Sequence, residues 1–215
     1  MKEDALLQKP EFENLQKYLQ FSKRTDCNEE IIKIAMNINE PTDGFTIRKI
    51  LLWMNQNTVR LVDAKDRKKF KRSSTEILES GERTGCCDSS TLFTSIARAK
   101  GIPTMQIICI NKDTGRDGHF YVASYLKNSG NNRRDWILID SDTPVKDIRD
   151  VRLSYLDLND RNISRRRYAY AYTDDYSNVE LNGIKINSIE NMNRLQDNVL
   201  NIIDKKDFII KRERD

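Results

Sequence analysis

The spacing of apolar residues along the chain changes near residue 100. Before that point apolar positions recur every three or four residues, as they do on helices that bury one face. Ile31, Ile34, Ala35 and Ile38 form one such set. The spacing predicts helices over 11–22, 28–38, about 46–58 and 86–100.

The ends of these predicted helices carry recognisable signals. Asp26 is placed to cap the N-terminus of the second helix. The stretch Gly101-Ile102-Pro103 ends the fourth helix, because glycine commonly follows a last helical turn and proline cannot continue one. The basic stretch 60–72 is expected to be an exposed connection that leads to residues 73–80.

After Pro103 the apolar residues gather in short runs rich in Ile, Val and aromatic residues, which are typical of strands. Two polar connections rich in Gly and Asn separate the runs, as expected of turns. We therefore predict an antiparallel meander of three consecutive strands. The predicted strands cover 104–110, 119–126 and 136–140.

Beyond residue 150 the pattern is weaker. The alternation YAYAY (168–172) fits a strand, and 179–189 fits a hairpin that turns at Asn182-Gly183. Apolar spacing predicts a last amphipathic helix over 189–203, and the tail 205–215 is expected to fray.

Composition sets the class of protein. A chain of 215 residues with 33% charged and 38% hydrophobic residues suits a globular protein with one core, with or without an accessory lobe. The net charge of +4 permits an anionic partner without demanding one. No apolar run is long enough to span a bilayer, and the start of the chain is too charged for a signal peptide. Four irregularly spaced cysteines do not suggest a disulfide framework, so we expect a reducing, cytoplasmic setting.

The chain contains a single histidine, His119. A mechanism or a zinc site that needs two imidazoles is therefore excluded. A mechanism that needs one imidazole must use His119, which follows a glycine at the start of the second predicted strand.

Two cysteines stand side by side where the fourth helix begins. Successive residues of a helix are rotated by about 100°. On this projection Cys86 shares an apolar face with Phe93 and Ala97, whereas Cys87 falls on a polar flank beside Arg98. The projection therefore favours Cys86 as the thiol that faces the sheet.

Three residues on neighbouring elements combine into a candidate catalytic group. A thiol at a helix N-terminus is stabilised as the reactive thiolate by the helix dipole and by free N–H groups. Asp88 opposes the thiolate, so a cation must offset its charge. His119 suits the base that pairs with Cys86, and Asp140, at the end of the third strand, suits the acceptor that holds the imidazole.

Each of these residues also has an ordinary explanation. A buried cysteine is usually a small apolar side chain, and this is what we expect of Cys27 and Cys109. A histidine before a strand is commonly a loop residue, and an aspartate at a strand end commonly forms a turn. The order of the three residues, and the elements that carry them, favour a catalytic group over three unrelated residues.

These motifs resemble those of a known family. GCCDSSTLFTSIARAKGIPTMQIICI (85–110) resembles the core signature of the transglutaminase-like superfamily, in which Gly-(x)-Cys-x-Asp/Glu opens a helix that ends in Arg-Ala-x-Gly-Ile-Pro. HFYVASYL (119–126) resembles the family's histidine strand, and WILIDSD (136–142) resembles its Trp-x-x-x-Asp strand. The likeness covers about 26–145.

The resemblance implies a fold and a set of roles. It implies a papain-like α+β fold, in which a helical lobe and the nucleophile helix pack on an antiparallel β-sheet. It implies that Cys86 is the nucleophile, that His119 acts as base and then as acid, and that Asp140 orients the imidazole. Asp88 takes the family's acidic position. The implied chemistry is acyl transfer through a Cys86 thioester, with no cofactor and no metal.

The shape of the pocket stays open at this point. Cys87 stands where the family commonly has a bulkier residue, and Ser89-Ser90 stand where it has a more apolar pair. Asn55, Gln56 and Asn57 are candidates for a second donor to an oxyanion.

On this basis we predict a helical extension (1–25), a catalytic core (26–145) and an accessory segment (146–215) that packs on the core as a hairpin and a helix. We expect hydrolysis of a peptide or side-chain amide bond in a protein or peptide substrate, because the sequence shows no site that would hold an amine acceptor against water. The alternatives are a protein-glutamine transglutaminase that uses an amine acceptor, a catalytically silent scaffold, and a module that binds nucleic acid or an anionic surface.

The binding-module alternative rests on two basic runs. These are RKKFKR (67–72) and the three arginines 165–167, which precede Tyr168, Tyr170 and Tyr172. We favour a solvated charged face instead, because acidic residues interleave with basic ones elsewhere, and we expect neither a nucleic-acid nor a membrane partner.

Overall fold

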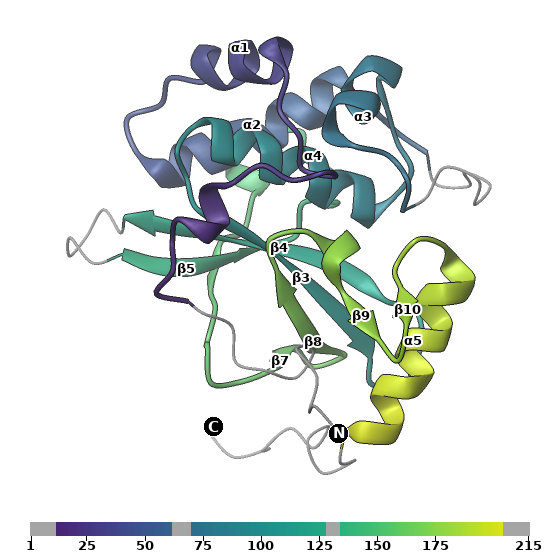
Figure 1. The fold of residues 1–215 in the computed structure, drawn as a ribbon. Helices are drawn as coiled ribbons and strands as arrows, with labels where there is room; N and C mark the ends of the chain where they lie inside the picture. Colours follow the sequence, from purple (N-terminus) through teal and green to yellow (C-terminus); the bar gives the residue numbers. More distant parts are fainter. Residues whose placement is uncertain (1–11, 62–69, 128–133, 204–215) are drawn as a thin grey trace.

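The computed structural model describes residues 12–61, 70–127 and 134–203, so the tail predicted to fray lies outside the described residues (Figure 1). The helices are α1 (Glu29–Asn37), α2 (Asp43–Asn57), α3 (Ser74–Ser80), α4 (Cys86–Ala99) and α5 (Ile189–Ile202). The strands are β1 (Val59–Arg60), β2 (Glu82–Arg83), β3 (Thr104–Asn111), β4 (His119–Lys127), β5 (Arg134–Ile139), β6 (Ser154–Tyr155), β7 (Asn162–Ser164), β8 (Arg167–Thr173), β9 (Glu180–Leu181) and β10 (Ile184–Lys185). Short 3-10 helices are η1 (Lys17–Leu19), η2 (Ile148–Asp150) and η3 (Tyr176–Asn178).

Six strands form one antiparallel sheet in the order β6-β5-β4-β3-β8-β7. The predicted meander is confirmed, since β3 pairs with β4 and β4 pairs with β5. On its other side β3 pairs with β8, which comes from the segment predicted as accessory. Residues after 146 therefore complete the sheet as well as pack on it. The division of the chain into extension, core and accessory segment stays a prediction.

Different parts of the chain cover the two faces of the sheet. Successive side chains of a strand point to opposite faces. Val122 and Leu126 of β4 pack with the helices α1 to α4, whereas Ala123 packs with Tyr18 and Trp136 on the other face. The helix α5 covers β3 and β8 on the same face as α4, further along the sheet (Figure 1).

The helix α4 contacts α1, α2 and α3 on one side and β3 and β4 on the other. All its residues from Cys87 to Arg98 are buried. The flank that carries Cys87 is therefore polar in composition and yet buried. Its polar groups tolerate burial because they are hydrogen-bonded: the Thr94 hydroxyl donates to a carbonyl one turn earlier at 2.7 Å, and the Arg98 guanidinium donates to three backbone carbonyls of other segments.

Three local predictions also need correction. Residues 12–25 form only the short turn η1 in place of a helix over 11–22. The cap of α1 is Asn28, whose side chain accepts from a first-turn N–H at 2.9 Å, whereas Asp26 accepts from the Thr75 N–H at 3.0 Å. In the connection predicted to be exposed, Arg72 is buried.

The C-terminal elements follow the pattern read from the sequence. The hairpin turns at Asn182-Gly183, with Leu181 of β9 paired to Ile184 of β10, and α5 follows it. Among the residues that the structure describes, no helix is both long and apolar enough to cross a bilayer.

Candidate active site

The three predicted catalytic residues come together in space. Cys86 is the first residue of α4, His119 is the first residue of β4, and Asp140 directly follows β5. His119 Nε2 lies 3.0 Å from Asp140 Oδ1, and the Cys86 thiol is a second hydrogen-bonding partner of the same ring. Because Nε2 faces Asp140, the nitrogen that is left for Cys86 is Nδ1. The structure thus assembles the group, while the catalytic roles of its members stay predictions.

The register of the sheet explains how Asp140 reaches His119. Val122 of β4 pairs with Ile139 of β5, so continuing the register places Asp140 opposite Tyr121. Tyr121 lies on the same side of β4 as His119, two residues away. The Tyr121 ring meets the His119 ring nearly edge-to-face, with ring centroids 4.6 Å apart. The imidazole is therefore held by a carboxylate at one nitrogen and by an aromatic ring at its side.

The electrostatic surroundings favour a charged imidazole. Burial of the His119 ring opposes its charged form, but hydrogen bonds to Asp140 and Cys86 outweigh burial and raise the pKa of His119 to about 10. Burial also opposes ionisation of Asp140, yet the hydrogen bond from His119 and the charge of the ring lower the pKa of this carboxyl below its ordinary value. Both shifts favour the form of the pair in which His119 is an imidazolium and Asp140 a carboxylate.

The two adjacent cysteines have different surroundings. Cys87 is 2% exposed and belongs to the same apolar cluster as Phe120. Burial, reinforced by the charge of Asp88, raises the pKa of the Cys87 thiol well above its ordinary value. Both thiols line the same cleft, but Cys86 is only half-buried. The structure therefore points to the predicted cysteine for a different reason, because Cys86 is the more accessible of the two and is the partner of His119.

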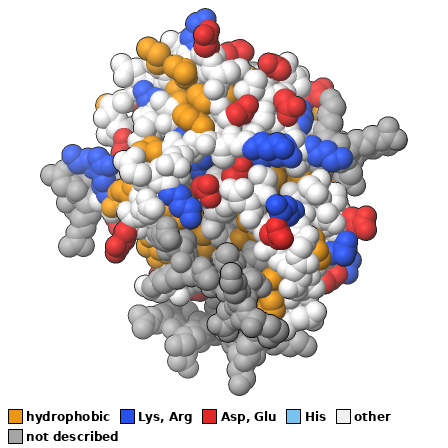
Figure 2. All heavy atoms as spheres, in the orientation of Figure 1, with side chains coloured by type: hydrophobic (Ala, Val, Ile, Leu, Met, Phe, Trp, Pro, Cys, Tyr) orange, Lys and Arg blue, Asp and Glu red, His pale blue; other side chains and the backbone are white. Residues whose placement is uncertain are grey.

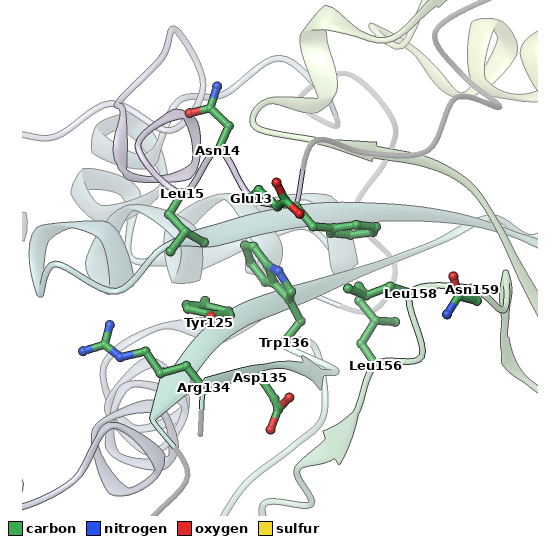
Figure 3. Close-up of a pocket in the computed structure, with 11 residues that line it drawn as sticks. Glu13, Asn14, Leu15, Tyr125, Arg134, Asp135, Trp136, Leu156, Leu158 and Asn159 are labelled. Carbon is green, nitrogen blue, oxygen red and sulfur yellow. The ribbon is translucent and has the colours of Figure 1, made fainter. Parts of the chain in front are cut away.

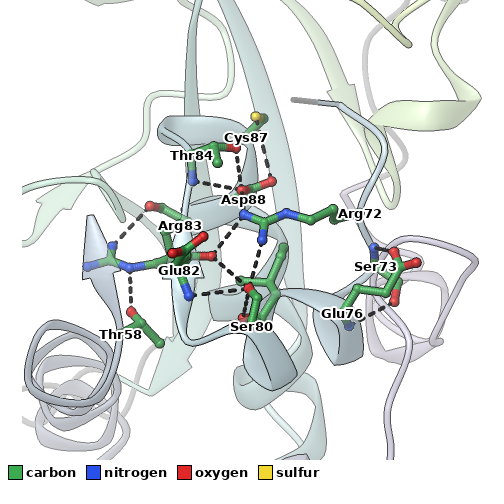
Figure 4. A network of polar contacts seen from close by, with 12 residues as sticks. Thr58, Arg72, Ser73, Glu76, Ser80, Glu82, Arg83, Thr84, Cys87 and Asp88 are labelled. Carbon is green, nitrogen blue, oxygen red and sulfur yellow. Dashed lines mark hydrogen bonds and ion pairs between the residues drawn. The ribbon is translucent and has the colours of Figure 1, made fainter. Parts of the chain in front are cut away.

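Asp88 has the cation that the sequence argument required. Its carboxylate is ion-paired with Arg72 and accepts hydrogen bonds from the Thr84 N–H at 2.7 Å and the Thr84 hydroxyl at 2.6 Å (Figure 4). Asp88 and Arg72 are both buried. The positive charge of Arg72 thus balances the negative charge of Asp88 at the helix terminus that carries Cys86.

A second polar network, which the sequence reasoning missed, lies behind Asp140. The Asp142 N–H donates to Asp140 Oδ1 at 3.1 Å. The Asp142 carboxylate accepts two hydrogen bonds from the Arg60 guanidinium, at 3.0 and 2.6 Å, and one from the Ser89 hydroxyl at 2.8 Å. Asp142 thereby ties the loop after β5 to β1 and to α4. The only signal in the sequence was a second acid two residues after Asp140.

Arg83 anchors this network from the interior. It is 1% exposed and donates to Ser89 at 3.0 Å and to the Thr58 hydroxyl at 2.6 Å (Figure 4). Burial lowers the pKa of Arg83, and the nearby charge of Asp142 works against that shift. The parallel pairing of β1 with β2 sets Arg60 opposite Arg83.

The candidates for a second oxyanion donor find no support. The side-chain amides of Asn55 and Asn57 donate to carbonyls of their own helix, at 2.9 and 2.8 Å, and Gln56 is exposed to solvent. None of the three lines the cleft beside Cys86. The remaining donors are the backbone N–H groups of the first turn of α4, which have no partner within the helix.

The cleft beside Cys86 has a volume of about 470 Å³. A larger cavity of about 1130 Å³ lies around Trp136 and Tyr125, and it is lined by none of the three candidate catalytic residues (Figure 3). We therefore assign the smaller cleft as the candidate active site, because Cys86 lines it.

The model of the transglutaminase-like superfamily matches residues 32–141, just over half of the chain. The chain belongs to the transglutaminase-like superfamily. The matched span contains Cys86, His119 and Asp140, so the resemblance read from the sequence is confirmed.

Among solved structures, this superfamily member is similar to a protein from Cytophaga hutchinsonii described as a "putative cysteine protease". The two share 17% sequence identity with a TM-score of 0.54, and the match covers 77% of this chain and 48% of the other. The chain thus spans about half the length of that protein, and the likeness shows the fold. No curated protein matches the chain. The predicted α+β fold, with helices packed on an antiparallel sheet, is confirmed, and it is a fold of cysteine-dependent catalysis.

Proposed function

We propose that this chain hydrolyses a peptide or side-chain amide bond of a protein or peptide substrate through a thioester on Cys86. The observation that carries the proposal is the His119 ring, which has Asp140 at Nε2 and the Cys86 thiol as its other partner, while Cys86 itself lines a cleft. The description of the structural neighbour as a cysteine protease supports the same class of reaction.

The proposed reaction has two steps. The Cys86 thiolate attacks the carbonyl carbon, and the C–N bond breaks as the imidazolium of His119 passes its proton to the leaving amine. Backbone N–H groups of the first turn of α4 stabilise the oxyanion. Neutral His119 then takes a proton from water as the water oxygen attacks the thioester, and the C–S bond breaks to release the acid.

Asp140 acts on this reaction through His119. Its carboxylate accepts from Nε2, which keeps Nδ1 directed at the thiol and stabilises the imidazolium. The Tyr121 ring limits rotation of the imidazole from the side.

Hydrolysis and amine transfer are separated by the fate of the acyl group. A pool of Gln-containing peptides is incubated with the protein in ¹⁸O-water with a labelled primary amine, and the products are measured by mass spectrometry. Hydrolysis places one ¹⁸O atom in each new carboxylate, and we expect this product to exceed amine-labelled peptide. The Cys86→Ala variant forms neither product, while Cys87→Ala is the matched control that forms both as the wild type does.

Other outcomes select the alternatives. Dominant amine incorporation identifies a transglutaminase. A folded protein that forms neither product and does not react with a thiol probe at Cys86 is a silent scaffold.

A nucleic-acid module is less favoured by the surface. Basic and acidic side chains are interspersed over the face drawn in Figure 2, with no large patch of one sign among the coloured residues. Residues 67–69 of the basic run 67–72 lie outside the described residues, and Arg72 is buried. A filter-binding titration against salt tests this function, and binding that weakens as salt rises would support it. The cytoplasmic location stays a prediction.

A further inference from the structure

The cleft beside Cys86 is completed by residues that follow the family match. The match ends at residue 141, yet Arg167 of β8 and Ile189, Met192 and Asn193 of α5 line this cleft together with Cys86. One wall of the substrate cleft is therefore supplied by a part of the chain outside the matched core.

The position of this wall is fixed against the histidine strand. A Cβ atom on Gly118 would lie 2.2 Å from Gln196 Nε2 and 2.5 Å from Met192 Cε, so α5 packs directly on the residue before His119. Met192, Leu195 and Val199 of α5 are buried in the apolar cluster that also holds Phe120, and Gln196 is buried beside them on the same helix. The wall and the imidazole are thus parts of one packed unit.

The wall carries a guanidinium without a matching carboxylate. Arg167 is half-buried and donates to the Asp117 carbonyl oxygen. Among the described residues, no carboxylate lies within ion-pair distance of Arg167. Arg116 also lines the cleft, but it pairs with Asp197 at 3.4 Å near the surface. Asp117 also lines the cleft, but its carboxylate is exposed, where water and salt screen it.

The charge of Arg167 acts on a side chain, Tyr121, that the candidate catalytic residues also influence. Burial raises the pKa of Tyr121 to about 12, and the charges of Asp140, Arg167 and Cys86 all act on this same phenol. Part of the cleft lining is apolar, because Phe70, Phe120 and Met192 line it and are buried.

We infer that this cleft recognises a substrate group with an apolar stem and a carboxylate head next to the scissile amide, and that Arg167 binds the carboxylate. The inference rests on the proposed function of Cys86. It makes Arg167, together with α5, the specificity determinant that this chain adds to the family core.

Two alkylating reagents test the inference without a known substrate. Iodoacetate and iodoacetamide present an anionic and a neutral head, and in each case the thiolate sulfur displaces iodide. The rates at Cys86 are followed by peptide mapping, and the quantity compared is the ratio of the iodoacetate rate to the iodoacetamide rate. We expect Arg167→Gln to lower this ratio by about threefold to tenfold, because a positive charge near the sulfur is lost. Arg167→Lys retains the charge and keeps most of the ratio.

Arg116→Gln is the matched control, because this second cleft arginine already has a carboxylate partner. Its ratio stays near that of the wild type. If Arg167→Gln does not fold, competition on the wild type replaces it: hexanoate should protect Cys86 from iodoacetamide better than hexanamide does, at constant ionic strength.

The failures are distinguishable. Cys86 that reacts with both reagents no faster than Cys27 overturns the proposed function. Cys86 that reacts rapidly, but with the same ratio in wild type and Arg167→Gln or with equal protection by hexanoate and hexanamide, overturns only the anionic subsite.

Discussion

The two sides of the first turn of α4 place adjacent cysteines in opposite environments. On the cleft side, half-buried Cys86 meets the His119 ring that Asp140 holds. On the interior side, Cys87 is buried beside Asp88, whose charge is matched by Arg72. Both thiols lie at the same positive helix end, so the helix dipole alone does not distinguish them.

The difference shows what makes a thiol reactive in this fold. Burial without a cation partner keeps the Cys87 proton in place. An imidazolium supplied by a distant strand gives Cys86 a counter-charge for its thiolate. The partner that the sheet delivers, and not the helix terminus, therefore separates the two cysteines.

The largest effect is expected from the cysteines themselves. Cys86→Ala should reduce hydrolysis by about 10⁴-fold or more, since the nucleophile is lost. Cys87→Ala should leave activity within a few-fold of wild type. Iodoacetamide at mildly acidic pH, followed by tandem mass spectrometry, should label Cys86 before Cys27, Cys87 or Cys109. First labelling of Cys87 would reverse the assignment of the two sides.

Asp140→Ala should lower kcat/KM by about 10²- to 10⁴-fold, because the imidazole loses the acceptor that orients it and stabilises its charge. The alkylation of Cys86 at mildly acidic pH should slow as well. Circular dichroism checks that the variant is folded. Unchanged turnover in a folded variant would mean that another group holds His119.

The interior side is tested by stability. Arg72→Met leaves the buried Asp88 carboxylate without its cation, and should lower the free energy of unfolding by about 3–5 kcal/mol. Urea denaturation measures the loss. The double variant Arg72→Met with Asp88→Asn should regain part of it, because no buried charge is left unpaired. A double variant no more stable than the single one would show that packing, rather than charge, sets the loss.

The network behind Asp140 predicts a smaller effect on catalysis. Asp142→Asn weakens the bonds to Arg60 and Ser89 that hold the loop after β5, and should lower kcat by about tenfold with little change in KM. Asp147→Asn is the matched control, because this carboxylate pairs with exposed Arg149 and is not part of the hydrogen-bond network of Asp142. Equal kinetics of the two variants would remove Asp142 from the positioning of Asp140.

The smallest effect concerns the pH dependence of stability. The pKa of folded His119 is raised to about 10, so its contribution is complete below its ordinary pKa of about 6.5 and is lost as the pH rises towards 10. The pKa of Asp140 is lowered, so its contribution is lost as the pH falls below about 4. Wild type should therefore exceed Asp140→Asn in unfolding free energy more at pH 5 than at pH 9.5. A constant difference across urea titrations would contradict the charged pair.

Much of the fold was accessible from local patterns. Period-three-to-four spacing located α1, α2, α4 and α5, and β-branched runs located β3, β4 and β5, because these elements bury one face and carry clear end signals. The prediction failed at η1, where Tyr18 is buried against the sheet although its segment is not an α-helix. Residue spacing also gave no sign that the polar groups on the flank of α4 are buried, where hydrogen bonds satisfy them.

The candidate site divides in the same way. The single histidine, the cysteine at a helix start and the aspartate at a strand end were sufficient to name the group, since residue type and chain position limit the chemistry. The sequence was not sufficient to predict that Cys87 is more buried than Cys86, because burial depends on how the start of α4 packs against distant parts of the chain. No local sequence pattern predicts the ion pairs Arg72–Asp88 and Arg60–Asp142. The partners are 16 positions apart in the first pair and 82 in the second.

The sequence by itself determined the elements and the identity of the reactive residue types, because both follow from short-range spacing and side-chain chemistry. Only the tertiary structure decided how deeply each thiol is buried, which arginines neutralise the buried acids, and which residues form the second wall of the cleft. Arg167 and α5 form this wall because β8 pairs with β3 and α5 packs against Gly118. Such contacts join distant parts of the chain, and they form only when the whole core packs.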